Sequence, residues 1–500
     1  MSKPARQPSQ VTKPHQERKT VSRRRFLKTA AASSAVFSTF AIAGTKASGR
    51  ILGANDTVRL AVAGINGRGQ AHISGFSRSK DVEIAYLVDP DTRLFESRSK
   101  QVEEHNNNTP KCVQDIREVL DDPNVDAISI ATCNHWHSLM TVWACMAGKN
   151  VYVEKPMSHN VFEGRQCVKA AQNNNCVVQH GTQQRSSGSR AREIAALQSG
   201  NYGKLLVSKG YASKPRWSIG NKPVKPIPNG LDYDLWLGPA DETPYHENLV
   251  HYNWHWSWNT GNGEIGNQGV HQMDIARWAI KDATLPNKVI SLGGRFGYED
   301  QGETPNTQVT VYEFGDVMLV FEVRGLVGKK GDIDTKYGSE IRNEYYTTEG
   351  RIADGKFFAN GSSQGETLDD LGGEVYPGGE WGSFINAVRE NNPDMVNGGV
   401  EDAHYSSALC HLGNISYRLG STTTMAGVNS PYANNQQVND SIEKIKENLG
   451  RINLRLDQAE CQVGPMLEFD PAKEQFIDND AANAMLTRNY RGEFTVPKDI

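Results

Sequence analysis

Short buried strands that alternate with helices constrain the fold of this sequence more than any other feature. The first apolar run, 59–63, ends in a glycine turn, and further runs end at Asp89, Ala131, Glu154 and Gly181. Helical segments such as 137–147 and 161–173 lie between them. Strands that alternate with helices form a parallel sheet, because each crossover places a helix on one face. We predict an α/β domain with a doubly wound parallel sheet over residues 50–182.

The pattern changes after about residue 200. Longer strands with few helices between them are predicted at 205–211, 288–298, 308–314 and 317–323. Such strands pair antiparallel, and one face of the sheet can remain open. We therefore predict a second, α+β domain over residues 183–420 with a mostly antiparallel sheet, one face of which is either exposed or covered. Residues 421–500 are polar, and we expect an extension that wraps around the body of the protein.

The first 49 residues differ in charge from the rest of the chain. They contain ten Lys and Arg and one acid, whereas the remainder contains 44 Lys and Arg and 57 Asp and Glu. Ser22-Arg23-Arg24-Arg25-Phe26-Leu27-Lys28 ends the basic stretch, and small apolar residues follow to residue 43. This order matches a twin-arginine signal, which is read by the twin-arginine export machinery. We predict that residues 1–49 are this signal and a linker and that the protein is periplasmic; the alternative is a basic tail beside a chance apolar helix.

The composition excludes several other classes. The acidic body argues against nucleic acid as a partner, because phosphate neutralisation requires clustered Lys and Arg. No apolar run approaches the roughly 20 residues of a membrane span, so we expect no integral membrane segment. The seven cysteines form no C-x-x-C pair, which argues against a disulfide framework or a zinc site. We expect no metal.

The glycine turn has the features of a dinucleotide-binding loop in a Rossmann domain. Gly64-Ile65-Asn66-Gly67-Arg68-Gly69 fits G-x-G-x-x-G with Asn66 at the second glycine position. Such a turn lets the backbone approach a pyrophosphate at the N-terminus of the next helix. Asp89 ends the second strand, where a carboxylate accepts hydrogen bonds from the adenosine ribose and repels a 2′-phosphate. We predict NAD rather than NADP, although Arg68 is close in sequence; a turn that serves packing alone is the alternative.

Three polar clusters follow strands or precede a helix in the same region. They are Thr132-Cys133-Asn134-His135-Trp136-His137, Glu154-Lys155-Pro156 and the segment 263–274 with the pattern Gly-x-His-x-x-Asp. Together they resemble the Gfo/Idh/MocA oxidoreductase family, and most closely its exported branch. The resemblance covers roughly residues 57–420, and the Glu-Lys-Pro and Gly-x-His-x-x-Asp patterns are its specific marks.

This resemblance implies a Rossmann domain followed by an open-faced second domain, whose sheet often forms contacts in a homodimer or homotetramer. It also implies a sugar, inositol or related polyol as substrate. It implies NAD-dependent oxidation of a hydroxyl group by hydride transfer to nicotinamide. Lys155 and His271 match the family's catalytic residues, with Lys155 orienting the hydroxyl and His271 acting as general base. An imidazole with an ordinary pKa of about 6.5 suits reversible proton transfer.

The remaining candidate residues follow from the same resemblance. The predicted cofactor-binding residues are Gly64, Asn66, Gly67, Arg68, Gly69, Asp89, Thr132, Asn134, His135, Glu154, Lys155 and Gln183. The predicted substrate-binding residues are His137, Arg185, Trp254, Asn267 and Asp274. Many family members carry Asp at the position of Asn267. Because an amide cannot take up a proton, we expect Asn267 only to hydrogen-bond a substrate hydroxyl.

Trp254, Trp256 and Trp258 occupy alternate positions. On a strand all three would share one face. They would form either a stacking platform for a pyranose ring or core packing behind the active site.

Two other functions fit the resemblance. Some relatives hold NAD tightly and use a transient oxidation for glycosidic cleavage or epimerisation. The glycosidases among them carry valine between Glu and Pro, so Lys155 favours net redox, whereas the scarcity of free NAD outside the cytoplasm favours a retained cofactor. A non-catalytic sugar-binding protein is the third possibility, and the presence of Asp89, Lys155 and His271 argues against it.

Overall fold

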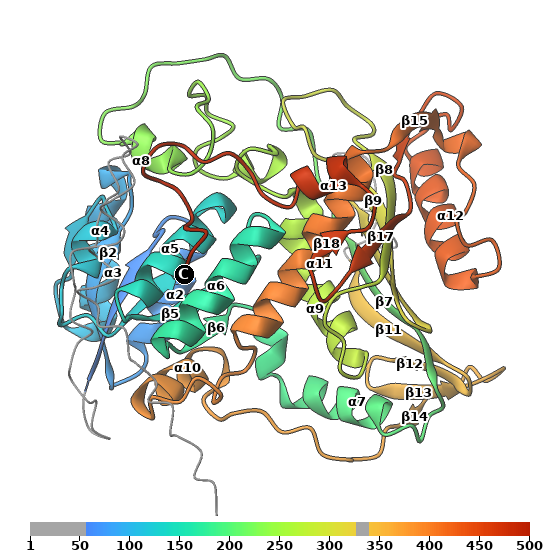
Figure 1. Cartoon of the computed structure of the whole chain (residues 1–500), viewed down its shortest axis with the longest axis horizontal. Helices are drawn as coiled ribbons and strands as arrows, with labels where there is room; N and C mark the ends of the chain where they lie inside the picture. The colour runs from blue at the N-terminus through green and yellow to red at the C-terminus, as the bar shows by residue number, and fades with distance from the viewer. Residues whose placement is uncertain (1–56, 327–339) are drawn as a thin grey trace, which may run out of the picture. The chain divides into compact units, whose positions relative to one another are not determined.

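A computed structural model describes residues 57–326 and 340–500, so the predicted export signal lies outside the described residues. The first sheet has six strands in the order β3-β2-β1-β4-β5-β6 (Figure 1). These strands are β1 (Val58–Ala63), β2 (Val82–Val88), β3 (Lys111–Val113), β4 (Ala127–Ile130), β5 (Asn150–Val153) and β6 (Val178–His180). Every neighbouring pair is parallel. The predicted doubly wound Rossmann sheet is confirmed.

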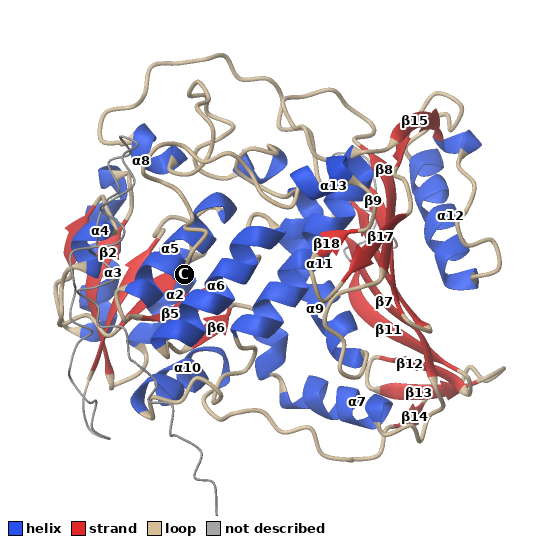
Figure 2. Cartoon of the chain, in the orientation of Figure 1, coloured by secondary structure: helices blue, strands red, loops and turns tan. Residues whose placement is uncertain are grey.

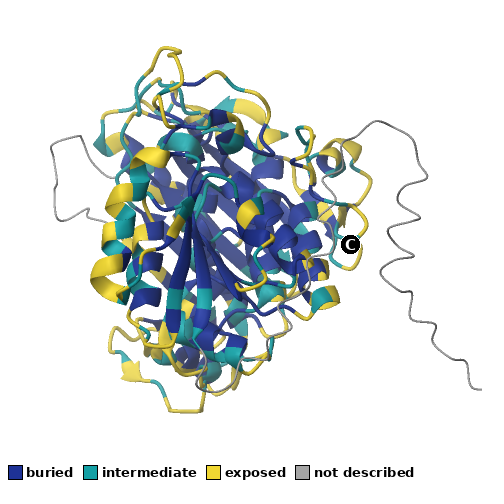
Figure 3. Ribbon diagram, turned by 90° about the vertical axis from the view of Figure 1, so that its left-hand side faces the viewer, coloured by how far each residue is buried: buried dark blue, intermediate teal, exposed yellow. Residues whose placement is uncertain are grey.

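Helices cover both faces of this sheet, because the strands are apolar on both sides. In β1, Ala61 and Ala63 pack with one buried cluster, whereas Leu60 and Val62 pack with another. The helices of this domain are α2 (Gly69–Ser77), α3 (Phe95–Asn106), α4 (Arg117–Leu120), α5 (Asn134–Met146) and α6 (Val161–Asn174). Figure 3 shows that the strands are buried while the outer sides of the helices are exposed.

One later helix returns to the first sheet. Phe384 and Val388 of α10 (Gly379–Arg389) pack in the same cluster as Leu60 and Val62. This segment falls within the range predicted for the second domain, 183–420, but its apolar side chains complete the core of the first.

The second sheet has twelve strands and is mostly antiparallel, as predicted (Figure 2). Its central strands are β7 (Leu205–Ser213), β8 (Lys288–Gly294), β9 (Thr307–Phe314), β10 (Val317–Arg324) and β11 (Glu340–Thr347). Only β10 and β7 pair in parallel. The smaller strands are β12 (Gly350–Ala353), β13 (Lys356–Ala359), β14 (Glu366–Thr367), β15 (Ser421–Thr424), β16 (Glu460–Val463), β17 (Leu467–Asp470) and β18 (Gln475–Phe476).

Alternate residues of these strands face different helices. Leu319 and Phe321 pack with α9 (Val270–Ala279) and α11 (Val400–Arg418). Val320 lies in another cluster with the apolar side of α12 (Gln436–Arg451), which belongs to the C-terminal extension. The extension therefore covers part of the sheet face that was expected to be open (Figure 1). The shorter helices are α7 (Gly188–Gln198), α8 (Tyr233–Leu237) and α13 (Asp480–Ala484).

The long segment 214–258 crosses to the carboxyl edge of the first sheet. The Thr92 amide donates to Gly230 O (2.9 Å), and the Asp232 amide donates to Pro90 O (2.8 Å). The end of the chain fastens this segment, because Arg491 Nε donates to Gly238 O (3.1 Å). Among the described helices, none is both long enough and apolar enough to cross a membrane.

Candidate active site

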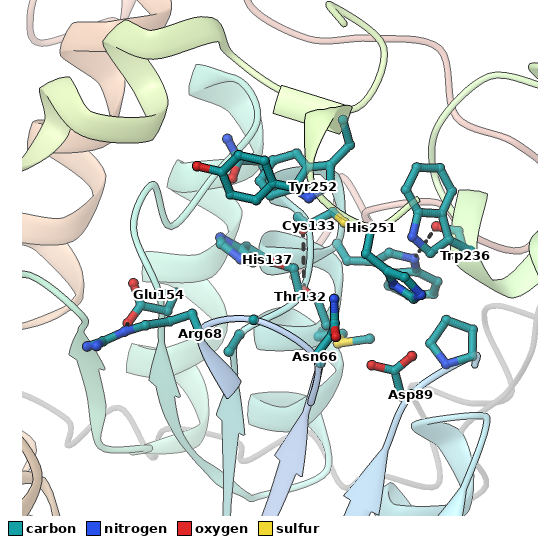
Figure 4. A pocket seen from close by; sticks show the side chains of 18 of the residues that line it. Asn66, Arg68, Asp89, Thr132, Cys133, His137, Glu154, Trp236, His251 and Tyr252 are labelled. Carbon is teal, nitrogen blue, oxygen red and sulfur yellow. Dashed lines mark hydrogen bonds and ion pairs between the residues drawn. The ribbon is translucent and has the colours of Figure 1, made fainter. Parts of the chain in front are cut away.

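A cavity of about 600 Å³ lies at the carboxyl edge of the first sheet (Figure 4). Ligands bind at this edge in doubly wound sheets, where the strand order reverses. Fourteen of the predicted site residues line it: Gly64, Asn66, Gly67, Arg68, Asp89, Thr132, Asn134, His137, Glu154, Lys155, Gln183, Trp254, Asn267 and His271. The structure places Gly69, His135, Arg185 and Asp274 behind this lining.

The glycine turn presents backbone to the cavity. Gly64 has φ +79°, and a Cβ atom there would lie 2.6 Å from the backbone of Ala131. A Cβ at Gly69 would lie 1.9 Å from Gly64 O, whereas one at Gly67 would meet nothing within 4 Å. The first and third glycines are thus required by the close turn, and the open side of Gly67 leaves room for a pyrophosphate at the N-terminus of α2.

Asp89 is held at the end of β2 by backbone amides. Ile65 N donates to Oδ2 (2.9 Å), and Asp91 N donates to Oδ1 (3.0 Å). Burial raises the pKa of Asp89 to about 6, although both amides oppose the shift. A carboxylate fixed in this way at the rim of the cavity fits a ribose diol.

Arg68 points away from Asp89, toward the other side of the cavity (Figure 4). Its Nε donates to Glu154 Oε1 (2.7 Å), and its guanidinium also pairs with Glu380. His72 contacts Glu154 as well (3.0 Å). Burial opposes ionisation of Glu154, but the hydrogen bond from His72 and the charges of His72 and Arg68 hold its pKa below the usual value. Arg68 is therefore engaged by carboxylates of the protein itself.

Glu380 is a site residue that the sequence did not indicate. It starts α10 and accepts hydrogen bonds from Tyr152 Oη (3.0 Å) and Gln183 Nε2 (3.0 Å). Its sequence neighbourhood resembles an ordinary helix start, and its partners lie about 200 residues earlier. The cavity also has lining residues from segment 214–258 that were not predicted, namely Lys214, Leu235, Trp236, His251 and Tyr252.

Lys155 lies at the centre of the cavity wall, directly after β5. Its Nζ donates to the backbone carbonyl of Asn267. Burial lowers the pKa of Lys155, while the carboxylates of Glu154 and Glu264 oppose this shift. The Asn267 side chain donates to Glu264 Oε2 (3.1 Å), so Asn267 contacts Lys155 through its backbone.

His271 is half-buried in the first turn of α9, which follows the π-helical turn η4 (Ile265–Gly269). Burial, reinforced by the positive charge of Lys155, lowers the pKa of His271 to about 3. Its imidazole is therefore neutral at physiological pH, and the ordinary pKa of about 6.5 expected from the sequence is not what this environment gives. Within the part of the chain that the structure describes, it has no hydrogen-bond partner in the protein, so it is free to accept one from a ligand.

Backbone carbonyls of the protein flank the rings of both histidines of Asn-His-Trp-His, of which His137 lines the cavity and His135 does not. The ring nitrogens of His135 lie 3.1 Å from Thr260 O and 2.9 Å from Trp236 O. Those of His137 lie 2.6 Å from Pro156 O and 3.0 Å from Thr132 O. Both imidazoles are buried, and burial lowers the pKa of each. Because carbonyls of the protein occupy both edges of each ring, they position the cavity wall.

Arg185 and Asp274 form a buried ion pair with each other. Arg185 Nε and Nη2 both donate to the Asp274 carboxylate at 2.9 Å. Ser406 Oγ also donates to Asp274 (2.7 Å), and the Arg185 guanidinium stacks over Trp278 at 4.6 Å. Arg185 was predicted to bind substrate, and Asp274 to bind substrate or to position the base. Neither lines the cavity, and their ion pair anchors α9, the helix that carries His271.

The three tryptophans do not share a face, because no strand forms there. Asn253–Trp256 is a 3₁₀ helix. Trp254 lines the cavity, whereas Trp256 is buried with Arg295 over its ring at 4.7 Å. Trp258 lies under Arg418 in a second cavity. The shared-face prediction is wrong, and only Trp254 is placed to contact a ligand in the first cavity.

Comparison with known proteins agrees with both domains. Residues 58–182 match the family model "Oxidoreductase family, NAD-binding Rossmann fold", and residues 200–320 match "Oxidoreductase family, C-terminal alpha/beta domain". A levoglucosan dehydrogenase structure with NADH superposes with a TM-score of 0.53 at 16% identity, covering 71% of this chain and 95% of that one. That similarity concerns the fold.

Three curated relatives are similar over part of the chain. Levoglucosan dehydrogenase from Pseudarthrobacter phenanthrenivorans is 24% identical over 49% of this chain and 58% of its own length. A glycosyl hydrolase family 109 protein from Shewanella sp. (strain ANA-3) is 28% identical over 35% of this chain and 40% of its own length. The NAD(+)-dependent scyllo-inositol 2-dehydrogenase of Bacillus subtilis (strain 168) is 28% identical over 59% of this chain and 73% of its own length. The chain thus spans about half the length of the first two. Through its NAD-binding and α/β domains, the chain belongs to the Gfo/Idh/MocA oxidoreductase family.

Proposed function

We propose that this protein is an NAD-dependent oxidoreductase that acts on a hydroxyl group of a sugar, sugar derivative or inositol. The observation that supports it most directly is that Lys155 and the neutral His271 line the same cavity as the glycine turn and Asp89. The named activities of two relatives, on levoglucosan and on scyllo-inositol, point to the same substrate class.

Different residues of the cavity would bind the cofactor, orient the substrate and accept its proton. The backbone around Gly67 fits the pyrophosphate of NAD, and Asp89 fits the adenosine ribose. Nicotinamide, when bound, supplies the acceptor for the hydride that leaves the substrate carbon. Lys155 donates a hydrogen bond that orients the substrate hydroxyl, and His271 accepts its proton. Trp254 offers an apolar wall for the sugar carbons.

The adenosine end of the cavity favours NAD over NADP. Asp89 would repel a 2′-phosphate, and Arg68, the cation closest in sequence to the turn, is held by Glu154 and Glu380 on the opposite side.

The test is turnover of a panel of glucosides, amino sugars, uronates and inositols by the purified protein with NAD. We expect NADH to accumulate with at least one of them. His271→Ala should lower kcat by about 10²-fold or more while NAD still binds. His105→Ala, at an exposed position on α3, is the matched control. Undiminished turnover by His271→Ala would refute the assignment of the base.

Transient oxidation with a retained cofactor is the second candidate function. Trp236 and His251 from segment 214–258 line the cavity, and Arg491 from the end of the chain holds that segment down through Gly238 O. Such a cover is suited to retaining a cofactor, and one group of relatives carries a glycosyl hydrolase name. Release of sugar from a glucoside without net NADH, together with NAD recovered from heat-denatured protein, would favour this function over the first.

We also propose export and self-association. The order of basic, apolar and small residues up to position 47 supports twin-arginine export to the periplasm. The family resemblance supports a homodimer or homotetramer formed through the second sheet. Cell fractionation of the tagged protein and sedimentation of the purified protein test these two proposals.

A further inference from the structure

A second cavity, of about 440 Å³, lies on the other side of segment 254–262 from the first. Trp254 lines the first cavity, whereas Trp258 and Asn259 line the second. The remaining walls come from the loop before α6, the second half of α11 and the C-terminal extension around Arg488. The two cavities are separated by a hydrogen bond from Asn134 Nδ2 to Asn262 Oδ1 (3.0 Å). Asp241 and Glu303 complete the lining, so the cavity is built from parts of the chain that lie far apart in the sequence.

Two guanidinium groups in this cavity lack an acidic partner. Arg418 lies over the Trp258 ring at 4.9 Å, and burial lowers its pKa. Arg488 donates to Asn259 O (2.9 Å) and Asn259 Oδ1 (2.7 Å). Over residues 57–326 and 340–500, neither guanidinium has a carboxylate within ion-pair distance. Most of the partly buried arginines near the first cavity, by contrast, are paired, such as Arg68, Arg185 and Arg216.

The other ionisable groups near this cavity form no ion pair with either arginine in the described residues, although burial raises the pKa of Glu163 behind the wall and the charge of Arg488 opposes that shift. Burial lowers the pKa of His159 well below its usual value, with a contribution from the charge of Arg488, and burial lowers that of His411 to about 3. Both imidazoles are therefore neutral. Asp241 and Glu303 lie at exposed positions, and Glu303 Oε2 already accepts from Ser257 Oγ (3.0 Å) and Trp258 N (2.7 Å). Arg418 is exposed like Asp241 and Glu303, whereas Arg488 is half-buried. Burial lowers the pKa of Arg418, and the charge of Glu303 opposes this shift without forming an ion pair.

We propose that this second cavity binds a small organic anion, a carboxylate that also carries hydroxyl groups, such as a sugar acid. The planar guanidinium groups match a carboxylate in geometry and charge, and stacking on Trp258 holds the plane of Arg418. The neutral imidazoles and the amides of the wall can donate to and accept from hydroxyl groups. This proposal does not depend on the function proposed for the first cavity.

The test is calorimetric titration of the full protein, without added NAD so that neither sugar is oxidised in the first cavity, with glucuronate and separately with glucose. We expect glucuronate to bind and glucose to bind at least tenfold more weakly. Arg418→Gln and Arg488→Gln should each weaken glucuronate binding at least tenfold. Arg455→Gln is the control, because Arg455 is exposed and pairs with Asp457 (2.5 Å). Unchanged thermal unfolding shows that a variant is folded. Equal binding of glucose and glucuronate, or undiminished binding by both arginine variants, would overturn the proposal.

Two further variants locate the anion and test the sign of the charge. Trp254→Ala alters only the first cavity and should leave glucuronate affinity unchanged; a large loss would place the anion there and refute the second site. Asp241→Asn removes a negative charge at the rim and should strengthen binding, by up to about twofold because the group is exposed. Weaker binding by Asp241→Asn would contradict a site selected by positive charge.

Discussion

At the scale of single residues, Asp89 shows how function opposes stability. Its carboxylate is 6% exposed, and burial raises its pKa to about 6. The ionised form is thus less favourable in the folded protein than in the unfolded chain near neutral pH. A buried carboxylate with a perturbed pKa at the edge of a cavity is typical of a functional site. Its two backbone hydrogen bonds keep it in place for a ligand.

Replacing Asp89 should change the choice of cofactor. In Asp89→Ala, the ribose loses a hydrogen-bond acceptor and a 2′-phosphate meets no repulsion. We expect kcat/KM for NAD to fall by about tenfold, equivalent to about 1.4 kcal/mol, and the preference for NAD over NADP to decrease by at least as much. Steady-state kinetics with both cofactors measure this. Asp115→Ala, at another acid that lines the cavity, is the control, and an unchanged cofactor preference in Asp89→Ala would contradict the assigned role.

Individual site residues differ in how far the sequence reveals them. Gly64 and Asp89 could be predicted because their spacing follows from a single βαβ unit. Glu380 could not, because a carboxylate at a helix start carries no local sign of a partner such as Tyr152. The contacts of His135 and His137 could not be predicted for a related reason. The carbonyls that bind their rings, such as Thr260 O, come from distant segments that no short motif reports.

At the scale of elements, the strands and long helices were predictable and the irregular segments were not. Buried strands such as β2 coincide with the predicted ranges because every residue favours burial. The period-two pattern at Trp254–Trp258 was misleading, since a 3₁₀ turn and a strand both accommodate a short aromatic run. The return of α10 to the first sheet depends on long-range packing of Phe384 with Leu60, which has no local signature.

Helix α9 depends on the ion pair between Arg185 and Asp274 for its position. In Asp274→Asn, the buried guanidinium loses its main counter-charge, and the free energy of unfolding should fall by about 3 kcal/mol. Because α9 carries His271, kcat should also fall while NAD affinity changes little. Denaturant unfolding and kinetics measure these effects.

The matched control for this prediction is Asp402→Asn. Asp402 also contacts Arg185 (3.4 Å), but its side chain is 41% exposed. Exposed ion pairs contribute up to about 1 kcal/mol, so this variant should lose less stability than Asp274→Asn. Equal losses in the two variants would show that the buried pair does not anchor the helix.

At the scale of the whole molecule, buried histidines connect the two sheets and the C-terminal extension. His135 lies below the segment 214–258, and His411 contacts Ser158 (3.0 Å) across α11 and the loop before α6. His404 of α11 contacts Glu474 in the extension (2.8 Å). Protonation of such groups would place charge in regions that exclude water, so the stability of the whole assembly of elements depends on pH.

The sign of this dependence follows from the pKa shifts. Burial lowers the pKa of His135, His180 and His255 to about 4, and that of His271 and His411 to about 3. The unfolded chain binds protons at these groups below its pKa of about 6.5, whereas the folded chain does not. Each group therefore removes up to about 1.4 kcal/mol of stability per pH unit as the pH falls from about 6.5 toward its folded pKa. Asp89, whose folded pKa is raised, adds stability as the pH falls from about 6 to about 4. This gain offsets the loss of stability from roughly one of these histidines.

We therefore predict that the thermal unfolding midpoint is highest at or above pH 7 and falls steeply between about pH 6.5 and 4.5. Scanning calorimetry at constant ionic strength measures this. His180→Gln should flatten the decline, because it removes one imidazole that must stay neutral, whereas the exposed His105→Gln should not. Below about pH 4.5 the decline should continue, since Asp274 and Glu474, whose folded pKa values are lowered to about 2, must then be protonated on unfolding. A midpoint that is constant from pH 7.5 to 5 would contradict the inference that these imidazoles are held neutral by burial.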